Sequence, residues 1–182
     1  MPLEDFVSNL GELTIVRLYN NNIFARGRRW KESALRGSWS VGDKGTASDR
    51  SGGGNTGSEN FLRNPQFLFQ IDGPEEEVVI QMLQWDGTES STPSFDGDRH
   101  RRRTLLIGFS IIKVEQNRKY RLHRMWPFCQ TVVEIDHQRR REIYYRGFFP
   151  KGKYLLVPTA YKPGSLGNFL IRVISQADTK LR

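Results

Sequence analysis

The stretch from Phe148 to Ile174 reads FFPKGKYLLVPTAYKPGSLGNFLIRVI and is the last long stretch of the chain that is rich in apolar residues. Aromatic and branched residues at Tyr154–Val157 predict a strand, which Pro158 closes because proline has no amide hydrogen for a ladder. Residues Asn168–Ser175 predict a return strand. Two such runs, joined by a polar loop with proline and glycine, predict a β-hairpin. A hairpin alone is marginally stable in water, so the rest of the chain must supply more sheet.

Further strand patterns precede this stretch. Residues Asn64–Ile71 alternate strictly between apolar and polar faces, and Val78–Trp85 is the next strand. Between them, Asp72–Glu77 predicts a turn, so three carboxylates lie at the tip of this hairpin. Leu105–Val114 is apolar on both faces, which is typical of a central strand. The remaining extended segments are expected at 12–19, 30–39, 131–135 and 143–147.

The chain therefore contains about eight strands at spacings of about ten residues, and one helical pattern that starts near Leu3 and ends before Gly11. These patterns predict an all-β fold, an antiparallel β-sandwich with a short N-terminal helical segment. We expect a single core, filled by Phe67, Phe69, Ile80, Ile107, Phe109, Leu155, Val157, Leu170 and Val173.

Length and composition limit the function. The 182 residues are enough for one core, and the net charge of +8 favours anionic partners. No leader or long apolar run is present, and the one cysteine excludes an intrachain disulfide, so we expect a cytoplasmic location, with membrane association as the alternative. The polar, glycine-rich segment 41–59 predicts a flexible loop. It lacks the pattern of a phosphate-binding loop, because Lys44 precedes Gly45.

The sequence contains no plausible catalytic or metal-binding constellation. Nucleophilic catalysis by Cys129 would require a positioned histidine. The three histidines, His100, His123 and His137, lie in arginine-rich surroundings, and Cys129 follows an apolar segment that predicts burial. The spacing of these residues also does not fit a zinc site. We therefore expect no catalytic residue in this stretch and no cofactor.

Carboxylates cluster in two loops. Glu75, Glu76 and Glu77 share one loop tip, and Asp86, Asp96 and Asp98 share another. Calcium prefers several oxygen ligands from loops, but neither cluster has the alternate-residue spacing of a calcium loop. The acidic loop Glu75–Glu77 is thus a candidate for a calcium or electrostatic contact, against the alternative of a solvated turn.

Two basic runs are candidates for binding anionic lipid or an acidic partner, because arginine holds phosphate and carboxylate groups in bidentate contacts. Nucleic-acid surfaces interleave exposed aromatics with basic residues, whereas the aromatics here point to the core, so no nucleic acid is expected. The first run could instead pair internally with Glu75–Glu77. The residues of the two runs are Arg99, Arg101, Arg102, Arg103, Arg139, Arg140 and Arg141.

Several segments, in order, resemble the regulatory β-sandwich domain, called domain III, of the calpain cysteine proteases. Met1 with Asp5-Phe6 and Leu13 resembles the last helix and exit strand of a calpain protease core. The other matching segments are Gly37-Ser38-Trp39 with Gly42, Asn64-Pro65-Gln66-Phe67, Ile107-Gly108-Phe109, and Pro150–Pro158 through Phe169–Val173.

The resemblance implies that residues 1–19 are the tail end of a protease core and a linker strand, and that 20–182 form a domain III-like β-sandwich. It implies a non-catalytic regulatory domain of a calcium-dependent, papain-like cysteine endopeptidase, whose catalytic Cys, His and Asn would precede Met1. The implied partners are the papain-like protease core, an EF-hand domain and anionic phospholipid. The alternative is a free-standing basic β-sandwich module that binds anionic membranes or a partner protein.

Overall fold

Two long strands, β2 (Phe67–Thr88) and β5 (Glu142–Ala160), form the centre of the fold. The computed structural model describes residues 4, 29–42, 50–88, 104–125 and 129–182. Residues Lys31–Arg182 form one compact unit, and Met1–Trp30 form another. The other elements of the first unit are β1 (Lys31–Trp39), the short 3-10 helix η1 (Phe61–Arg63), β3 (Ile107–Val114), β4 (Gln130–Gln138) and β6 (Leu166–Ser175).

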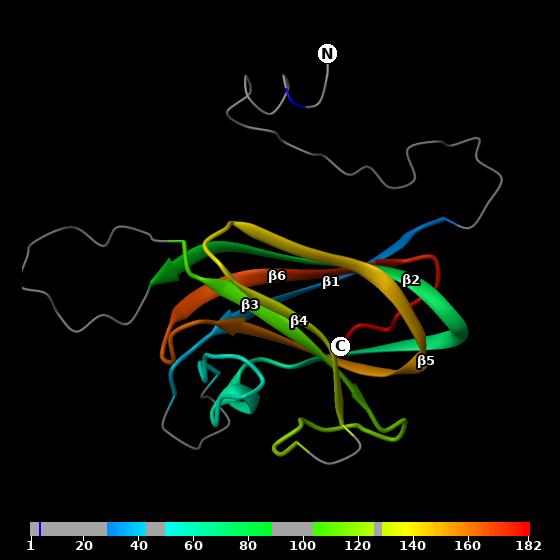
Figure 1. Cartoon of the computed structure of the whole chain (residues 1–182), viewed down its shortest axis with the longest axis horizontal. Coiled ribbons are helices and arrows are strands. Elements are labelled where there is room, and N and C mark those ends of the chain that lie inside the picture. Colours follow the sequence, from blue (N-terminus) through cyan, green and yellow to red (C-terminus); the bar gives the residue numbers. More distant parts are fainter. Residues whose placement is uncertain (1–3, 5–28, 43–49, 89–103, 126–128) are drawn as a thin grey trace, which may run out of the picture. The chain divides into compact units, whose positions relative to one another are not determined.

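The six strands form one sheet in the order β1-β6-β2-β5-β3-β4, with every pair antiparallel. The pairing between β2 and β5 shifts register between Ile71 and Glu75, where Asp72–Pro74 lie opposite Lys151 alone. Such a bulge bends a strand pair. Figure 1 shows β2 and β5 curving together at this point, so one sheet folds over into two facing layers.

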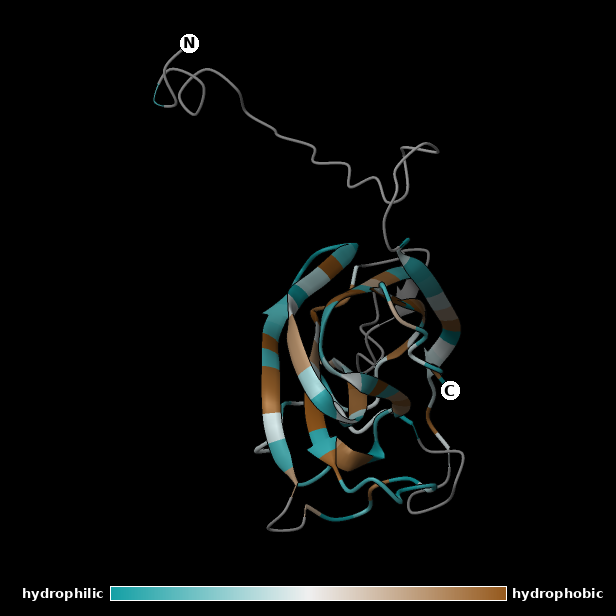
Figure 2. Cartoon of the chain, turned by 90° about the vertical axis from the view of Figure 1, so that its right-hand side faces the viewer, coloured by the Kyte–Doolittle hydropathy of each residue, from teal (hydrophilic) through white to brown (hydrophobic). Residues whose placement is uncertain are grey.

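The first layer contains β1, β6, the C-terminal part of β2 and the N-terminal part of β5. The second contains the other parts of β2 and β5, followed by β3 and β4. Alternate side chains of all six strands meet between the layers, which places Phe69, Ile80 and Phe109 at 0–1% exposure in the main core. Figure 2 shows the matching alternation of hydrophobic and hydrophilic residues along the strands.

A second, smaller core lies on the outer face of the second layer. Leu68, Leu155 and Val157 point away from the main core, and Phe61 and Leu122 from two flanking segments cover them. The segment that carries Phe61 is fastened by Asn64, which is fully buried. The amide nitrogen of Asn64 donates to the carbonyl oxygens of Gly53 (3.1 Å) and Phe61 (2.9 Å), and its Oδ1 accepts from the Gly53 N–H at 3.1 Å.

The predicted all-β, antiparallel class is confirmed, but the count of about eight strands is wrong for the described residues, which contain six. The sequence predicts a turn at Asp72–Glu77, but the segment contains a bulge inside β2, because β5 bends with it and the pairing resumes at Glu75 opposite Pro150 after a register shift. The predicted strands 143–147 and 154–157 are likewise parts of β5. The predicted N-terminal helix, the strand at 12–19 and the domain boundary at 19/20 lie outside the described residues.

The predicted hairpin of the C-terminal run is wrong. Strand β5 pairs with β2 and β3, and β6 pairs with β1 and β2, so the connection at Tyr161–Ser165 passes from one layer to the other. Pro158 does not end β5, which continues to Ala160. The single predicted core is also wrong, because Leu155 and Val157 belong to the second core. Leu170 is only partly buried.

The expected flexible loop at 41–59 is anchored in its described second half. Ser51, Gly52 and Gly53 are buried, and the Gly54 N–H donates to the Ala160 carbonyl at 3.1 Å. Gly53 adopts a φ of 64°, in the left-handed region that glycine reaches without steric cost. No helix in the described part of the chain is long and apolar enough to cross a membrane.

Candidate functional site

The first candidate site is the acidic bend, which we define as Asp72–Glu77 at the fold of β2. Its carboxylates have different environments: Glu75 is exposed, Glu76 is 9% exposed, and Glu77 accepts a 2.6 Å hydrogen bond from Nε of Arg146 on β5. Asp72 is joined to Nζ of Lys180 at 3.1 Å. The bend is thus an ion-paired element that ties β2 to β5 and to the C-terminal tail.

The charge state of Asp72 follows from these contacts. A hydrogen bond from Gln70 and a second one from Lys180 lower the pKa of the Asp72 carboxyl, and the charges of Lys180 and Lys151 add to the effect. The carboxylate is solvent-exposed, so its ion pair contributes little to stability. Cations of the same domain therefore already neutralise part of the bend, whereas Glu75 is exposed and has no ion pair among the described residues.

The second candidate site is the turn Arg139–Arg141 between β4 and β5. All three arginines are exposed, as an anion-binding role requires. Nη1 of Arg139 donates to the carbonyl oxygen of Thr104 at 2.7 Å, so this turn lies against the residue that follows the first basic run in the sequence. The first run itself, Arg99–Arg103, lies outside the described residues.

Gln84 fixes the position of this turn. Its buried amide donates to the carbonyl oxygens of Arg140 (2.7 Å) and Leu105 (2.9 Å) and accepts from the Leu105 N–H at 2.9 Å. The start of β3 and the β4–β5 turn are therefore held side by side. No local pattern indicates that these two segments meet, because Gln84 belongs to a third strand.

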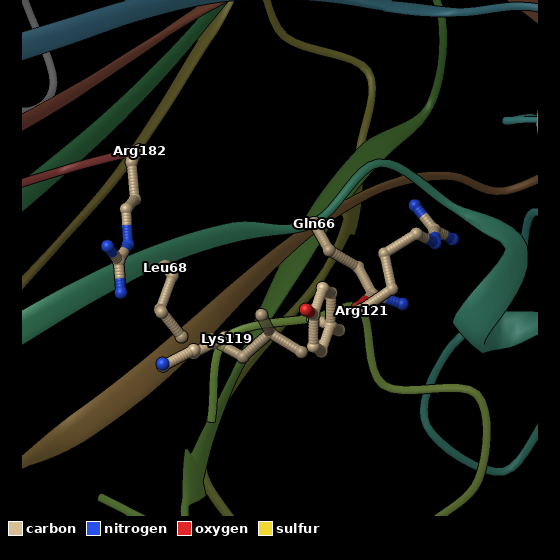
Figure 3. Close-up of a pocket in the computed structure, with 7 residues that line it drawn as sticks. Gln66, Leu68, Lys119, Arg121 and Arg182 are labelled. Carbon is tan, nitrogen blue, oxygen red and sulfur yellow. The ribbon is translucent and has the colours of Figure 1, made fainter. Parts of the chain in front are cut away.

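A third site was missed by the sequence reasoning. A cavity of about 200 Å³ lies beside the second core. Its lining contains three cationic side chains, Lys119, Arg121 and Arg182, and no Asp or Glu side chain. Gln66, Leu68, Tyr120 and Leu155 complete the lining. Figure 3 shows Lys119 and Arg182 approaching the cavity from the loop after β3 and from the C-terminal tail. The signal that could have found it is the run Arg118-Lys119-Tyr120-Arg121.

The lining cations differ in how strongly the protein holds them. Nη2 of Arg121 donates to the carbonyl oxygens of Leu62 (2.7 Å) and Asn64 (3.0 Å). Desolvation by burial, and then the charge of Arg50, lower the pKa of Arg121 to about 10. Within the described part of the chain, no hydrogen bond or ion pair engages the side chains of Lys119 and Arg182. These two cations are therefore available to a ligand.

The residues considered for catalysis are not brought together. Cys129 is half-buried and packs beside the second core, so the burial predicted for it is only partial. Nε2 of His137 lies 2.9 Å from the hydroxyl of Thr159, and His123 is exposed. His100 lies outside the described residues. In the described ranges, no group of three or more His, Cys, Asp or Glu side chains could hold a metal ion.

The geometry defines a class of protein: a two-layer, antiparallel β-sandwich with an ion-paired acidic bend and basic loops. Comparison with known proteins then identifies the family. The family model for the calpain large subunit, domain III, matches residues 35–174. The chain is 31% identical to calpain-5 of Mus musculus over all of its length, and 32% identical to calpain-5 of Caenorhabditis elegans over 96% of its length.

It is also 28% identical to the calpain-2 catalytic subunit of Homo sapiens over 97% of its length. The chain belongs to the calpain domain III family, which favours the regulatory-domain interpretation over a free-standing basic module. The chain spans about a quarter of the length of these relatives, namely 27% of the mouse protein and 26% of the other two.

Proposed function

We propose that this chain is the non-catalytic regulatory domain of a calpain-type cysteine endopeptidase, and that it couples a papain-like protease core to calcium and phospholipid signals. The observation that carries the proposal is the position of the acidic bend. The Arg146–Glu77 ion pair lies on the first-layer side of the bend, and Asp72 is paired with Lys180 of the C-terminal tail, which hydrogen-bonds Leu68 and Gln70 in the second layer. Charges that compete for Glu77 and Asp72 would therefore act on both layers.

The partners follow from the family and the charges. A protease core is the proposed partner of the acidic bend. Glu75 would contact a basic residue of the core, as would any carboxylate of the bend that gives up its ion pair within the domain. An EF-hand domain is a second proposed partner. Anionic phospholipid is proposed to contact the two basic runs, since about 1 kcal/mol of attraction is expected for each Lys or Arg near an anionic surface. The proposed location is cytoplasmic, with recruitment to the membrane.

The experiment that tests the regulatory role uses the full-length parent protein. We expect a Glu75→Gln, Glu77→Gln variant to shift the calcium concentration for half-maximal peptide hydrolysis while retaining its maximal rate. Gln116→Ala, which changes an exposed loop residue, is the control. A parent protein without a papain-like core, or an unchanged calcium midpoint, would overturn the proposal.

The isolated chain tests calcium directly. If the bend binds calcium, the melting temperature of the 182-residue chain should rise with calcium concentration, because a ligand of the folded state stabilises it by mass action. The rise should vanish in the Glu75→Gln, Glu77→Gln variant. If calcium leaves the melting temperature unchanged, the bend is a set of structural ion pairs and the calcium assignment is wrong.

The same chain should hydrolyse no peptide substrate, with or without calcium, because Cys129 has no hydrogen-bonded histidine among the described residues. Turnover that disappears in a Cys129→Ala variant would contradict the non-catalytic assignment.

A further inference from the structure

We propose that the cavity lined by Lys119, Arg121 and Arg182 is a headgroup pocket for an anionic phospholipid, with Tyr120 at its rim entering the membrane interface. The proposal takes its ligand class from the proposed function. It goes beyond that function in assigning the lipid to a surface other than the two basic runs.

The charges of the pocket favour a phosphate group. The side chains of Lys119 and Arg182 have no partner in the described part of the chain, and no Asp or Glu side chain lines the cavity to compete for them. Arg121 is held in place by the carbonyl oxygens of Leu62 and Asn64, so its guanidinium is pre-positioned. Guanidinium and ammonium groups are the usual protein ligands of phosphate oxygens.

The neutral part of the lining favours a phosphate that carries an organic group over inorganic phosphate. Leu68 and Leu155 form apolar walls. Gln66 offers no free donor, because its amide nitrogen donates to Leu62 and Leu122 and its oxygen accepts from the Leu122 N–H. The cavity of about 200 Å³ also far exceeds the roughly 10–15 Å³ that one water requires. A phospholipid headgroup with its glycerol backbone matches both the apolar walls and the volume of the cavity.

The loop that carries the pocket has the composition of a membrane-contact segment. Tyr120 is 83% exposed, the largest exposed fraction of any large hydrophobic residue in the described ranges, and Met125 is 36% exposed. Between them lie Arg121, His123 and Arg124. A ring with an apolar body and a polar hydroxyl favours the boundary between headgroups and acyl chains. Flanking cations attract an anionic surface to the same place.

Glu115 and Arg118 fix the base of this loop. They form an ion pair with each other, and the Arg118 carbonyl oxygen accepts a 3.1 Å hydrogen bond from the buried Nζ of Lys153 on β5. The loop is therefore anchored to the sheet immediately before Lys119 and Tyr120. A lipid that binds these residues needs little ordering of the loop, which lowers the entropic cost of binding.

The experiment is vesicle co-sedimentation of the 182-residue chain. The probes are vesicles of phosphatidylcholine alone and of phosphatidylcholine mixed with phosphatidylserine. We expect capture by the mixed vesicles only, and a fall on the order of tenfold or more in the Lys119→Gln, Arg182→Gln variant at low salt. A matched control, Lys31→Gln with Lys151→Gln, removes two exposed charges outside the pocket lining and should change capture far less.

Two further variants separate the pocket from the basic turn and from a general effect of charge. Tyr120→Ser should reduce the capture that persists at high salt, because screening weakens the charges and leaves the apolar contribution. Arg140→Gln with Arg141→Gln tests the basic turn. If only that variant lowers capture, or if the matched control lowers it as much as the pocket variant, the pocket assignment is wrong. Arg121 is left unchanged, since its removal would also break the contacts to Leu62 and Asn64.

Competition with soluble glycerol 3-phosphate identifies the source of the phosphate. A lipid pocket requires that the mixed vesicles capture the chain and that glycerol phosphate, which would occupy the same pocket, lower this capture toward the level of the Lys119→Gln, Arg182→Gln variant. If glycerol phosphate raises the melting temperature of the wild-type chain but not of the pocket variant, and no vesicle captures the chain, the ligand is soluble and the lipid proposal fails. These readouts are independent of protease activity, so the regulatory proposal can fail separately.

Discussion

The indole Nε1 of Trp39 donates a hydrogen bond to the carbonyl oxygen of Pro158 at 3.3 Å, from strand β1 in one layer to strand β5 in the other. The ring also packs against Phe169, with 4.5 Å between centroids. Trp39 is 2% exposed, although β1 is an edge strand. One side chain thus joins three strands and both layers, which gives a physical reason for a tryptophan at this position.

We expect Trp39→Phe to lower the free energy of unfolding by about 1–3 kcal/mol, because it leaves the buried Pro158 carbonyl without its donor. Trp39→Ala should cost about 3–5 kcal/mol, since it also removes the packing against Phe169. Urea denaturation followed by circular dichroism measures both. Trp85→Phe, at a residue that is 39% exposed, is the matched control and should cost under about 1 kcal/mol. Equal losses at both tryptophans would contradict the role of the hydrogen bond.

Asn64→Asp tests how the segment Arg50–Asn64 is fastened. The substitution keeps the shape but replaces the amide donor by a carboxylate that faces the carbonyl oxygens of Gly53 and Phe61. We expect a loss of about 2–4 kcal/mol in the free energy of unfolding, because the buried carboxylate would keep only the Gly53 N–H as a donor and would face two carbonyl oxygens. Amide hydrogen exchange should also increase in this segment. Asn55→Asp, at an exposed position, should leave both measurements unchanged.

Phe109 and Phe148 give a matched pair for the packing of the main core. Phe109 is 1% exposed between the layers, and Phe148 is 65% exposed on the outer face of β5. Phe109→Ala should lower the free energy of unfolding by about 3–5 kcal/mol through loss of buried area and the cavity left behind. Phe148→Ala should remain within about 1 kcal/mol of the wild type. A comparable loss at Phe148 would mean that its ring is covered in solution.

His137 predicts a dependence of stability on pH. Burial lowers the pKa of His137 from its ordinary value of 6.5, against the opposing charges of Asp136 and Glu134. The unfolded chain therefore binds the proton more readily than the folded one. This contribution to stability is complete above about pH 6.5 and is lost as the pH falls through the folded-state pKa.

The measurement compares the wild type with His137→Gln, which offers Thr159 a hydrogen-bond partner without titrating. The stability difference between the two should shift against the wild type as the pH falls from about 7.5 to about 5. His123→Gln removes an exposed imidazole and serves as the control. A difference that stays constant with pH would show that His137 does not couple protonation to folding.

Local patterns predicted the strands well where one face is buried. The alternation in Phe67–Ile71 places Phe69 and Ile71 in the main core and Leu68 in the second core, as its period of two requires. The apolar run of β3 is buried on both faces because loops cover the outer face of the second layer. Ile107 and Val173 also lie in the main core, as predicted.

Pairing could not be predicted in the same way, because it depends on residues far apart in the sequence. Gly73 and Pro74 are residues typical of turns. The strand nevertheless continues through them, because Lys151 lies opposite and β5 bends together with β2. The predicted hairpin of β5 and β6 is wrong for the same reason, because it assumes that strands close in the sequence pair with each other. The cavity was missed because Arg182 reaches it through the pairing of the C-terminal tail with Leu68.

The pairing of β1 with β6 constrains the order in which the sheet assembles. Trp39 lies opposite Gly167, and Lys31 lies opposite Ser175, so all the other strands separate these two in the sequence. Contacts between such distant segments make folding slow, typically milliseconds to seconds for comparable β proteins. During synthesis β1 leaves the ribosome before the other described strands. Its backbone groups stay unpaired until β6 has also been released. The interval exposes a strand edge to neighbouring nascent chains.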